Sequence, residues 1–309
     1  MSLDLIALGE TMLALAPPPG ESVRQASALL VDHAGAESNT CVGLARLGFR
    51  VAWVSRLGAD AAGDRILAAL ASEGPGGIDT RWVGRDATRP TGVMIKEPGA
   101  GVRYYRAGSA ASVIAPEDLA VVPVAEARAV LVTGVTALIG PRPHAAGLAL
   151  LNAARGLRIV DPNLRSGLWG SDRRAELVRP FIERCDLLLS GAQELAELIG
   201  DGDAEALARR ASFDSRRLAQ DRSERGPKEV VVRDASSIGA LGADGSWHVL
   251  DVRRDAAVDP IGAGDAFNAG YIAVRLRGGT IDDALRAGAR CGAAVTTAVS
   301  DTAGFPRRL

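Results

Sequence analysis

Short apolar segments alternate with stretches of helical hydrophobic spacing along most of the chain. The apolar segments lie at Leu3–Leu8, Val51–Val54, Ala129–Thr133, Leu157–Val160, Leu187–Ser190 and Glu229–Arg233. Helical spacing is found at Ser38–Leu47, Ala61–Ala71 and Pro143–Ala154. Strands that are apolar throughout and alternate with helices are typical of a parallel sheet covered by helices on both faces. The pattern predicts an α/β fold whose body has three layers, with a mainly parallel sheet between two layers of helices.

Two segments interrupt this alternation and predict a small β-sheet lid. Thr91–Lys96 and Val102–Arg106 have the character of strands, and the Glu-Pro-Gly-Ala-Gly sequence between them is typical of a hairpin turn. Residues 11–34 lack clear helical spacing at their start and contain a Pro-Pro-Pro-Gly sequence. We therefore predict a lid formed by residues 11–34 and 90–110. The body is then formed by residues 1–10, 35–89 and 111–309.

The charge balance excludes several classes of binding protein. The chain has 36 basic and 37 acidic residues, so no excess of positive charge indicates nucleic acid or an anionic membrane as a partner. The arginine-rich stretch Arg209–Pro227 also contains acids, which predicts an exposed helix and loop. Lys96 and Lys228 are the only lysines. No glycine-rich loop therefore ends in Lys-Ser or Lys-Thr, and Walker-type phosphate binding is excluded.

The cysteines and histidines do not have the spacing of a metal centre or a disulfide framework. The three cysteines, Cys41, Cys185 and Cys291, stand far apart, as in proteins of a reducing compartment. The three histidines form no ligand-spaced pair. The first residues do not resemble a signal peptide, and no apolar run reaches the ~20 residues of a membrane helix. We expect a cytoplasmic protein.

The segment Asp259–Tyr271 contains the strongest chemical signal. Gly262 and Gly264 can bring backbone N–H groups close to a ligand, and the helix expected to begin near Gly264 would direct its positive end into the turn. Asp265 lies in the first turn of that helix, where a carboxylate could take a proton from a hydroxyl while the amides hold a phosphoryl group. Taken alone, the motif is equally compatible with a glycine turn whose aspartate stabilises the helix start. It is not the G-x-G-x-x-G dinucleotide motif, because Phe267 occupies the last position.

Two motifs of the chain resemble the signatures of the ribokinase-like (PfkB) family of sugar kinases. Gly35-Ala36-Glu37-Ser38-Asn39, followed by Gly43–Gly48, is similar to the N-terminal signature of the family. Asp259–Gly270 is similar to its C-terminal signature, D-x-x-G-A-G-D-x-F. The two motifs stand in the order of the family, and the resemblance extends over nearly the full length.

The resemblance implies a Rossmann-like sheet with a β-lid, ATP as phosphoryl donor and Mg²⁺, and it is compatible with a bound monovalent cation such as K⁺. It implies that Asp265 is the general base. Gly262, Ala263 and Gly264 would form the anion hole around the transferred phosphoryl group. The N-terminal signature places three residues at the sugar: Gly35, Ala36 and Asn39.

Further segments are similar to 2-keto-3-deoxygluconate kinases. These are Gly35-Ala36-Glu37, Tyr104-Tyr105-Arg106-Ala107-Gly108-Ser109-Ala110, and Asp161–Arg165 with Leu168-Trp169. The chemistry agrees, since a sugar acid carries a carboxylate that the planar fork of an arginine can bind. Arg106 and Arg165 are the candidates, although Arg106 could be a surface residue and Arg165 could instead contact phosphates. Strand alternation directs one of the two tyrosines, Tyr104 or Tyr105, toward the body.

The nucleotide region matches the family less closely. The N-x-x-E motif of the family appears as Gly191-Ala192-Gln193-Glu194, which keeps Glu194 as an indirect magnesium contact. The K-x-G-x-x-G motif appears as Arg233-Asp234-Ala235-Ser236-Ser237-Ile238-Gly239. Arg233 and Gly239, together with Gly262 and Gly264, are therefore the predicted nucleotide contacts.

These features predict an ATP-dependent kinase for a primary hydroxyl of a small sugar acid, with 2-keto-3-deoxygluconate as the expected substrate and its 6-phosphate as the product. One alternative is a neutral-sugar kinase of the same family, similar to fructokinase or ribokinase. Another is a sugar-binding sensor without catalysis, which the presence of Asp265 disfavours. The strands of the lid have free edges, so we also predict a homodimer, or a multiple of it, assembled through the lid.

Overall fold

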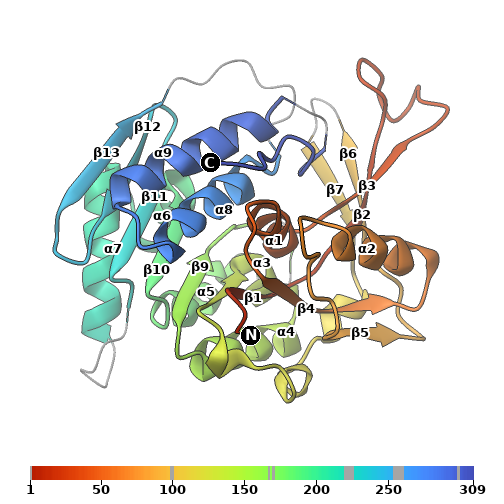
Figure 1. Cartoon of the computed structure of the whole chain (residues 1–309), viewed down its shortest axis with the longest axis horizontal. Helices are drawn as coiled ribbons and strands as arrows, with labels where there is room; N and C mark the ends of the chain where they lie inside the picture. Colours follow the sequence, from red (N-terminus) through yellow and green to blue (C-terminus); the bar gives the residue numbers. More distant parts are fainter. Residues whose placement is uncertain are drawn as a thin grey trace.

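The computed structural model describes residues 2–97, 101–165, 168, 171–218, 226–252, 261–297 and 300–309. These residues form a large sheet between two layers of helices and a second, smaller sheet (Figure 1). The nine strands of the large sheet run in the order β13-β12-β11-β10-β9-β8-β1-β4-β5. Their bounds are β1 Leu5–Leu8, β4 Val51–Gly58, β5 Val83–Asp86, β8 Ala129–Thr133, β9 Leu157–Asp161, β10 Leu187–Gly191, β11 Glu229–Arg233, β12 Ser237–Leu241 and β13 Trp247–Asp251.

Seven neighbouring strands pair in parallel, namely β11, β10, β9, β8, β1, β4 and β5. Strands β12 and β13 form an antiparallel hairpin at the β11 edge. All six predicted core strands are present in this sheet. The prediction of a mainly parallel sheet is thereby confirmed, and the antiparallel edge is an addition that the hydrophobic pattern did not indicate. Carboxyl ends of parallel strands meet at one edge of the sheet, where ligands bind in such folds.

The helices cover both faces of the large sheet. Their bounds are α1 Ala36–Arg46, α2 Ala61–Ala71, α3 Gly134–Ile139, α4 Pro141–Ala153, α5 Arg174–Ile182, α6 Ala192–Ile199, α7 Ala204–Leu218, α8 Ala263–Leu276 and α9 Ile281–Val295, with short 3₁₀ turns η1 Ala110–Val113, η2 Pro116–Leu119, η3 Val124–Glu126 and η4 Ser171–Arg173. Alternate residues of β1 belong to two separate cores. Leu5 and Ala7 pack under α1, α2, α8 and α9, while Ile6 and Leu8 pack against α3 to α7.

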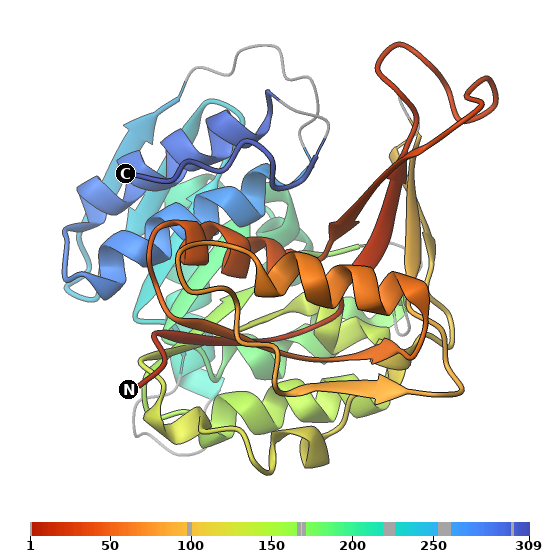
Figure 2. The ribbon, with the colours of Figure 1, turned by 45° about the vertical axis from the view of Figure 1, so that its right-hand side comes forward.

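The smaller sheet stands apart from the body and corresponds to the predicted lid. It consists of β2 Met12–Ala16, β3 Leu30–Ala34, β6 Val93–Glu97 and β7 Gly101–Tyr105, in the order β3-β2-β6-β7. Figure 2 shows these strands rising from one end of the molecule, beyond helix α2. The predicted hairpin is present as the antiparallel pair β6–β7. One face of this small sheet carries an apolar cluster that includes Met12, Met94 and Tyr104.

Helix ends follow the local sequence signals. The Thr280 hydroxyl accepts a hydrogen bond from the Asp283 backbone N–H (3.1 Å) and caps α9. The arginine-rich stretch begins inside α7, and its residues 219–225 lie outside the described residues. Within the described ranges, no helix combines the length and the apolar character needed to cross a bilayer.

Candidate functional site

A cavity lies where the carboxyl edge of the large sheet faces the lid. Its lining residues are Glu10, Met12, Ala34, Gly35, Ala36, Asn39, Met94, Tyr104, Arg106, Val135, Asn163, Arg165, Ile261, Gly262, Asp265 and Asp301. We call it the lid cavity. It brings together segments from both ends of the chain, and most of the predicted substrate residues line it.

The glycine turn before α8 has the backbone that its sequence requires. Gly262 has φ +84°, in the left-handed region, and a Cβ there would lie 2.6 Å from the Asp301 carbonyl oxygen. Helix α8 begins at Ala263, so its first backbone N–H groups are free of intrahelical partners and its positive end faces the turn. At Gly264, the nearest atoms to a Cβ belong to Arg233, at 3.8 Å. The turn therefore offers donors for an anion, as predicted; Asp259 and Pro260 of the motif lie outside the described residues.

Asp265 is buried in the first turn of α8, only 8% exposed. Its Oδ2 accepts a hydrogen bond from Asn39 Nδ2 at 2.8 Å. Burial raises the pKa of the Asp265 carboxyl well above its usual range; the hydrogen bond from Asn39 and the charge of Arg165 oppose this rise, while the charges of Asp161 and Asp301 add to it. A carboxylate with a raised pKa is a stronger proton acceptor, which suits a general base.

Helix α1 holds Asn39 in place from the opposite side. Gly35 precedes the helix, and a Cβ on it would lie 2.2 Å from the Glu10 carbonyl oxygen, so the chain passes too close for a side chain. Its N–H donates to Asn39 Oδ1 (3.4 Å), which orients the amide so that Nδ2 faces Asp265. Gly35 and Ala36 line the lid cavity together with Asn39.

The two tyrosines of the lid point in opposite directions. Tyr104 lines the lid cavity, whereas Tyr105 is 58% exposed and does not line it. The side chain of Arg106 is 8% exposed and forms an ion pair with Glu10, and its guanidinium lies 5.6 Å from the centre of the Tyr104 ring. Arg106 is therefore a buried residue of the cavity wall, and its charge is compensated by a carboxylate that the sequence analysis did not identify.

Arg165 differs from Arg106 in its surroundings. It lies on the loop after β9, lines the cavity and is exposed. Its guanidinium donates a 3.4 Å hydrogen bond to the neighbouring Leu164 carbonyl, and within the described ranges it forms no ion pair. The loop is fixed by Asn163, which has φ +36° and whose N–H donates to Asp161 Oδ1 (2.9 Å). Among the described residues, Arg165 thus makes no close ion pair, and its charge acts on the carboxylates of Asp265 and Glu194 from a longer distance.

A polar cluster lies beside the glycine turn. Asp161 Oδ2 accepts from Asn268 Nδ2 (2.6 Å) and pairs with Arg233 at 3.2 Å, while Arg233 also donates to Asn268 Oδ1 (2.5 Å). Arg233 also donates to the Gly264 carbonyl at 3.4 Å, so it stands next to the glycine turn; its role as a nucleotide contact stays a prediction. Asp161 and Asn268 are additions from the structure.

Glu194 and Gly239 are the other two residues predicted on the nucleotide side, and both have contacts within the protein itself. Both carboxylate oxygens of Glu194 accept backbone N–H groups, from Leu164 and Gly191 at 3.0 Å each, so this residue holds the Arg165 loop. Burial raises the pKa of Glu194, and the charge of Asp161 contributes. Gly239 lies under the Trp247 ring, whose nearest atom is 2.1 Å from where a Cβ would be, which explains the glycine by packing. The described residues contain no group of three metal-ligating side chains.

The C-terminal segment completes the cavity, which the sequence analysis did not foresee. Asp301 is 4% exposed, and its Oδ2 lies 3.4 Å from Asn39 Nδ2. Lys96 of lid strand β6 forms an ion pair with Asp301. Phe305 anchors the segment against Gly43 of α1, where a Cβ would lie 2.4 Å from its ring.

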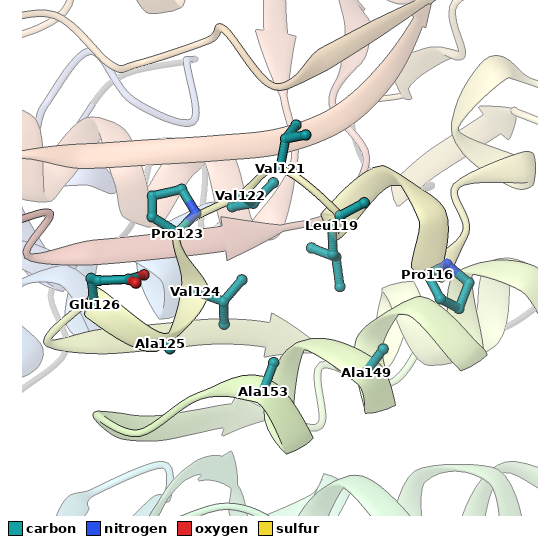
Figure 3. A pocket seen from close by; sticks show the side chains of 11 residues that line it. Pro116, Leu119, Val121, Val122, Pro123, Val124, Ala125, Glu126, Ala149 and Ala153 are labelled. Carbon is teal, nitrogen blue, oxygen red and sulfur yellow. The ribbon is translucent and has the colours of Figure 1, made fainter.

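A second hollow lies far from this chemistry, between the η2–η3 connection and helix α4 (Figure 3). Of its eleven lining residues only Glu126 is ionisable, and the others are apolar, such as Val121 and Ala149. It offers no group for acid–base or phosphoryl chemistry, so the lid cavity is the candidate active site.

Three curated relatives align over almost the whole chain. A 2-dehydro-3-deoxygalactonokinase of Haloferax volcanii is 30% identical, with 98% of this chain and 94% of the relative covered. A 2-dehydro-3-deoxygluconokinase of Bacillus subtilis is 30% identical over 100% of this chain and 94% of its own length. A fructokinase of Klebsiella pneumoniae is 29% identical over 99% and 97%.

Solved structures of similar proteins also align over almost the whole chain. The crystal structure of a PfkB protein from Polaromonas sp. JS666 is 34% identical, with a TM-score of 0.82 and coverage of 99% and 97% of the two chains. A putative ribokinase II from E. coli, solved in complex with ATP and Mg²⁺, has the same fold, with a TM-score of 0.86 at 19% identity over 99% and 96%. Residues 2–308 match the pfkB family carbohydrate kinases as a whole. The chain therefore belongs to the pfkB family of carbohydrate kinases, phosphotransferases that act on an alcohol group.

Proposed function

We propose that this carbohydrate kinase transfers the γ-phosphoryl group of ATP to the primary hydroxyl of a small sugar acid, with 2-keto-3-deoxygluconate (2-dehydro-3-deoxygluconate) as the substrate and its 6-phosphate as the product. The observation that carries this proposal is the exposed guanidinium of Arg165, which forms no close ion pair with a described residue, in the same cavity as the buried Asp265 carboxylate. A carboxylate at one end of the substrate would bind the cation, and a hydroxyl at the other end would meet the base.

The residues of the turn suit phosphoryl transfer. Asp265 accepts the proton of the attacking hydroxyl, and Asn39 holds the carboxylate in position at 2.8 Å. The backbone N–H groups of Ala263, Gly264 and Asp265 donate to the oxygens of the transferred group, where charge accumulates. Gly264 has no side chain between its backbone and the Arg233 guanidinium, which would lie 3.8 Å from a Cβ, so the transferred group can approach the backbone.

The residues that would face the nucleotide and the metal ion are proposed from their positions around the glycine turn. When bound together with ATP, Mg²⁺ would neutralise the charge of the phosphates. Arg233, at the end of β11, stands beside the turn on the side away from the lid and would face the phosphates. Glu194 fixes the loop that carries Arg165, which gives it an indirect role at the phosphates or metal.

A neutral-sugar kinase is the second candidate, because Glu10 compensates the charge of Arg106 and because a fructokinase is among the relatives. The two candidates differ in what Arg165 binds. A charge-assisted contact to a carboxylate contributes about 1.5–3 kcal/mol, so its loss costs roughly 10- to 150-fold in kcat/KM. A neutral ketose makes no such contact.

The test is a coupled ADP-release assay with 2-keto-3-deoxygluconate and with fructose, on the wild type, Arg165→Ala and Arg165→Lys. We expect the acid to be the better substrate, and Arg165→Ala to lose activity on the acid far more than on fructose. Arg165→Lys keeps the charge without the bidentate fork and should lie between them. Equal fractional losses on both substrates would assign Arg165 to the phosphates, and a preference of the wild type for fructose would overturn the sugar-acid assignment.

A further inference from the structure

Glu10 is a buried carboxylate in the wall of the lid cavity. It stands two residues beyond the end of β1, at the carboxyl edge of the large sheet, and its side chain is 1% exposed. A Cβ on Gly35 would lie 2.2 Å from its carbonyl oxygen, and a Cβ on Gly92 would lie 2.7 Å from its Oε1. The chain therefore packs closely around both the backbone and the side chain of Glu10, and the carboxylate has little room to turn.

Both carboxylate oxygens of Glu10 are occupied by residues that follow lid strand β7. Oε2 forms an ion pair with Arg106 Nη2, and Oε1 accepts a hydrogen bond from Ser109 Oγ at 2.6 Å. The centre of the Tyr104 ring lies 5.6 Å from the Cζ atom of the same guanidinium. Glu10 is therefore held on Arg106, and its oxygens are already engaged within the protein.

Arg106 keeps a donor that Glu10 does not use. Its side chain is 8% exposed and lines the lid cavity, and its Nε has no hydrogen-bond partner among the described residues. Over the same part of the chain, Glu10 is the one carboxylate that forms an ion pair with it. Glu10 therefore decides how much positive charge this arginine presents to a ligand in the cavity.

We propose that Glu10 is a specificity-determining residue that acts through Arg106. It cancels the charge of this arginine toward a ligand, and so leaves Arg165 as the group that distinguishes a sugar acid from a neutral sugar. The inference rests on the proposed function, because it concerns the substrate of that same cavity. It adds that the substrate carboxylate has one place to bind, and that a single buried residue of the body sets this.

Electrostatics explains why the two arginines differ toward an acid. A substrate carboxylate at Arg106 would stand beside Glu10, so the repulsion between the two carboxylates would offset most of the attraction to the guanidinium. Arg165 forms no close ion pair with a described residue, and it lines the same cavity. A sugar acid should therefore bind with its carboxylate at the loop after β9, and Arg106 should donate hydrogen bonds to keto or hydroxyl oxygens.

The first test measures kcat/KM for 2-keto-3-deoxygluconate and for fructose, and takes the ratio of acid to ketose. Glu10→Gln keeps the shape and an acceptor for Ser109 but frees the charge of Arg106, so we expect the ratio to rise about tenfold or more, through a lower KM for the acid. Arg106→Gln leaves the carboxylate alone in the wall and should lower the ratio by a similar factor. The double variant should return to within about threefold of the wild type, because both charges are gone.

A gain in the use of one substrate separates this role from a loss of structure, which would lower both values together. Glu229→Gln is the matched control, because it breaks another partly buried ion pair, with Arg275, at the start of β11 and so at the opposite edge of the sheet from the cavity. Its ratio should equal that of the wild type. A ratio in Glu10→Gln at or below that of the wild type overturns the inference. So does a double variant that keeps the ratio of Glu10→Gln.

The same role can be tested without turnover, by the rise in Tm that a bound compound gives. Gluconate and glucitol differ only in a carboxylate against a hydroxymethyl group. We expect gluconate to raise the Tm of Glu10→Gln more than that of the wild type, and glucitol to raise both alike. A gluconate shift that is the same in the two proteins overturns the inference. If the wild type phosphorylates no sugar acid, the proposed function fails, and the gluconate comparison still decides on Glu10.

Discussion

Replacing Arg106 by alanine should destabilise the whole protein, not only its binding of a substrate. The side chains of Arg106 and Glu10 are 8% and 1% exposed and form an ion pair across the junction of lid and body. Glu10 also accepts a hydrogen bond from Ser109 Oγ at 2.6 Å, and this bond would remain. The alanine variant therefore leaves a buried carboxylate without its counter-charge.

The magnitude follows from the burial of both partners. Removing one member of a buried ion pair typically costs about 3–5 kcal/mol, because the other charge stays desolvated. In a protein larger than 150 residues, 1 kcal/mol corresponds to about 2–4 °C in Tm, so we expect Arg106→Ala to melt roughly 5–15 °C below the wild type. Glu10→Gln in the same chain removes the charge with little change in shape, so the double variant should regain more than half of that loss.

Thermal melts of the wild type, both single variants and the double variant at one pH and one salt concentration give the comparison. Activity is then measured well below the Tm of the weakest variant, so that unfolding does not count as lost binding. If Arg106→Ala melts within about 1 °C of the wild type, the argument from the buried ion pair is refuted. If the double variant melts no higher than Arg106→Ala, the loss does not come from the charge left on Glu10.

Two further predictions concern the base and the lid. Asp265→Asn should lower turnover by ~10²-fold or more. Because folding raises the pKa of Asp265, the cost of burying its charge is absent below about pH 4, the pKa of the unfolded carboxyl, and grows as pH rises above it, so the asparagine variant should gain Tm over the wild type with rising pH; a gap that does not change with pH would contradict this. The lid face opposite the cavity exposes Val31 and Tyr105, 42% and 58%, so light scattering at micromolar concentration should find a dimer or a multiple of it, and Val31→Glu/Tyr105→Glu should reduce it to monomers; a monomeric wild type would refute the lid interface.

The fold was accessible from the sequence because its signals are local and repeated. Each core strand is an apolar run between turn residues, and helices α1, α2 and α4 show the helical spacing that the sequence indicates, so the alternation of strands and helices is visible from the sequence. The antiparallel β12–β13 edge was not predicted, because Gly239 and the polar residues of β13 carry no clear hydrophobic pattern of their own. Trp247 covers Gly239, and this contact exists only after the hairpin has formed.

The glycine turn before α8 was accessible as well, because a left-handed glycine and a helix start are properties of a few consecutive residues. Gly262 has φ +84° and α8 begins at the next residue, as the motif predicts. The hydrogen-bond partner of Asp265 could not be predicted from neighbouring residues in the same way. Asn39 was predicted from a family motif as a sugar contact, and its hydrogen bond to Asp265 joins positions 226 residues apart.

The charges of the lid cavity show why a count of arginines cannot establish specificity. Arg106 and Arg165 are equivalent in the sequence, since each follows a strand and each could bind a carboxylate. The structure separates them, because Glu10 compensates Arg106 while no described carboxylate pairs with Arg165. Lys96 is likewise compensated, by Asp301. Arg106 and Lys96 thus pair with carboxylates across the junction of lid and body, whereas Arg165 forms no ion pair with a described residue and can offer its charge to a ligand. Selection of an acid over a neutral sugar should therefore depend on the loop after β9 more than on the lid.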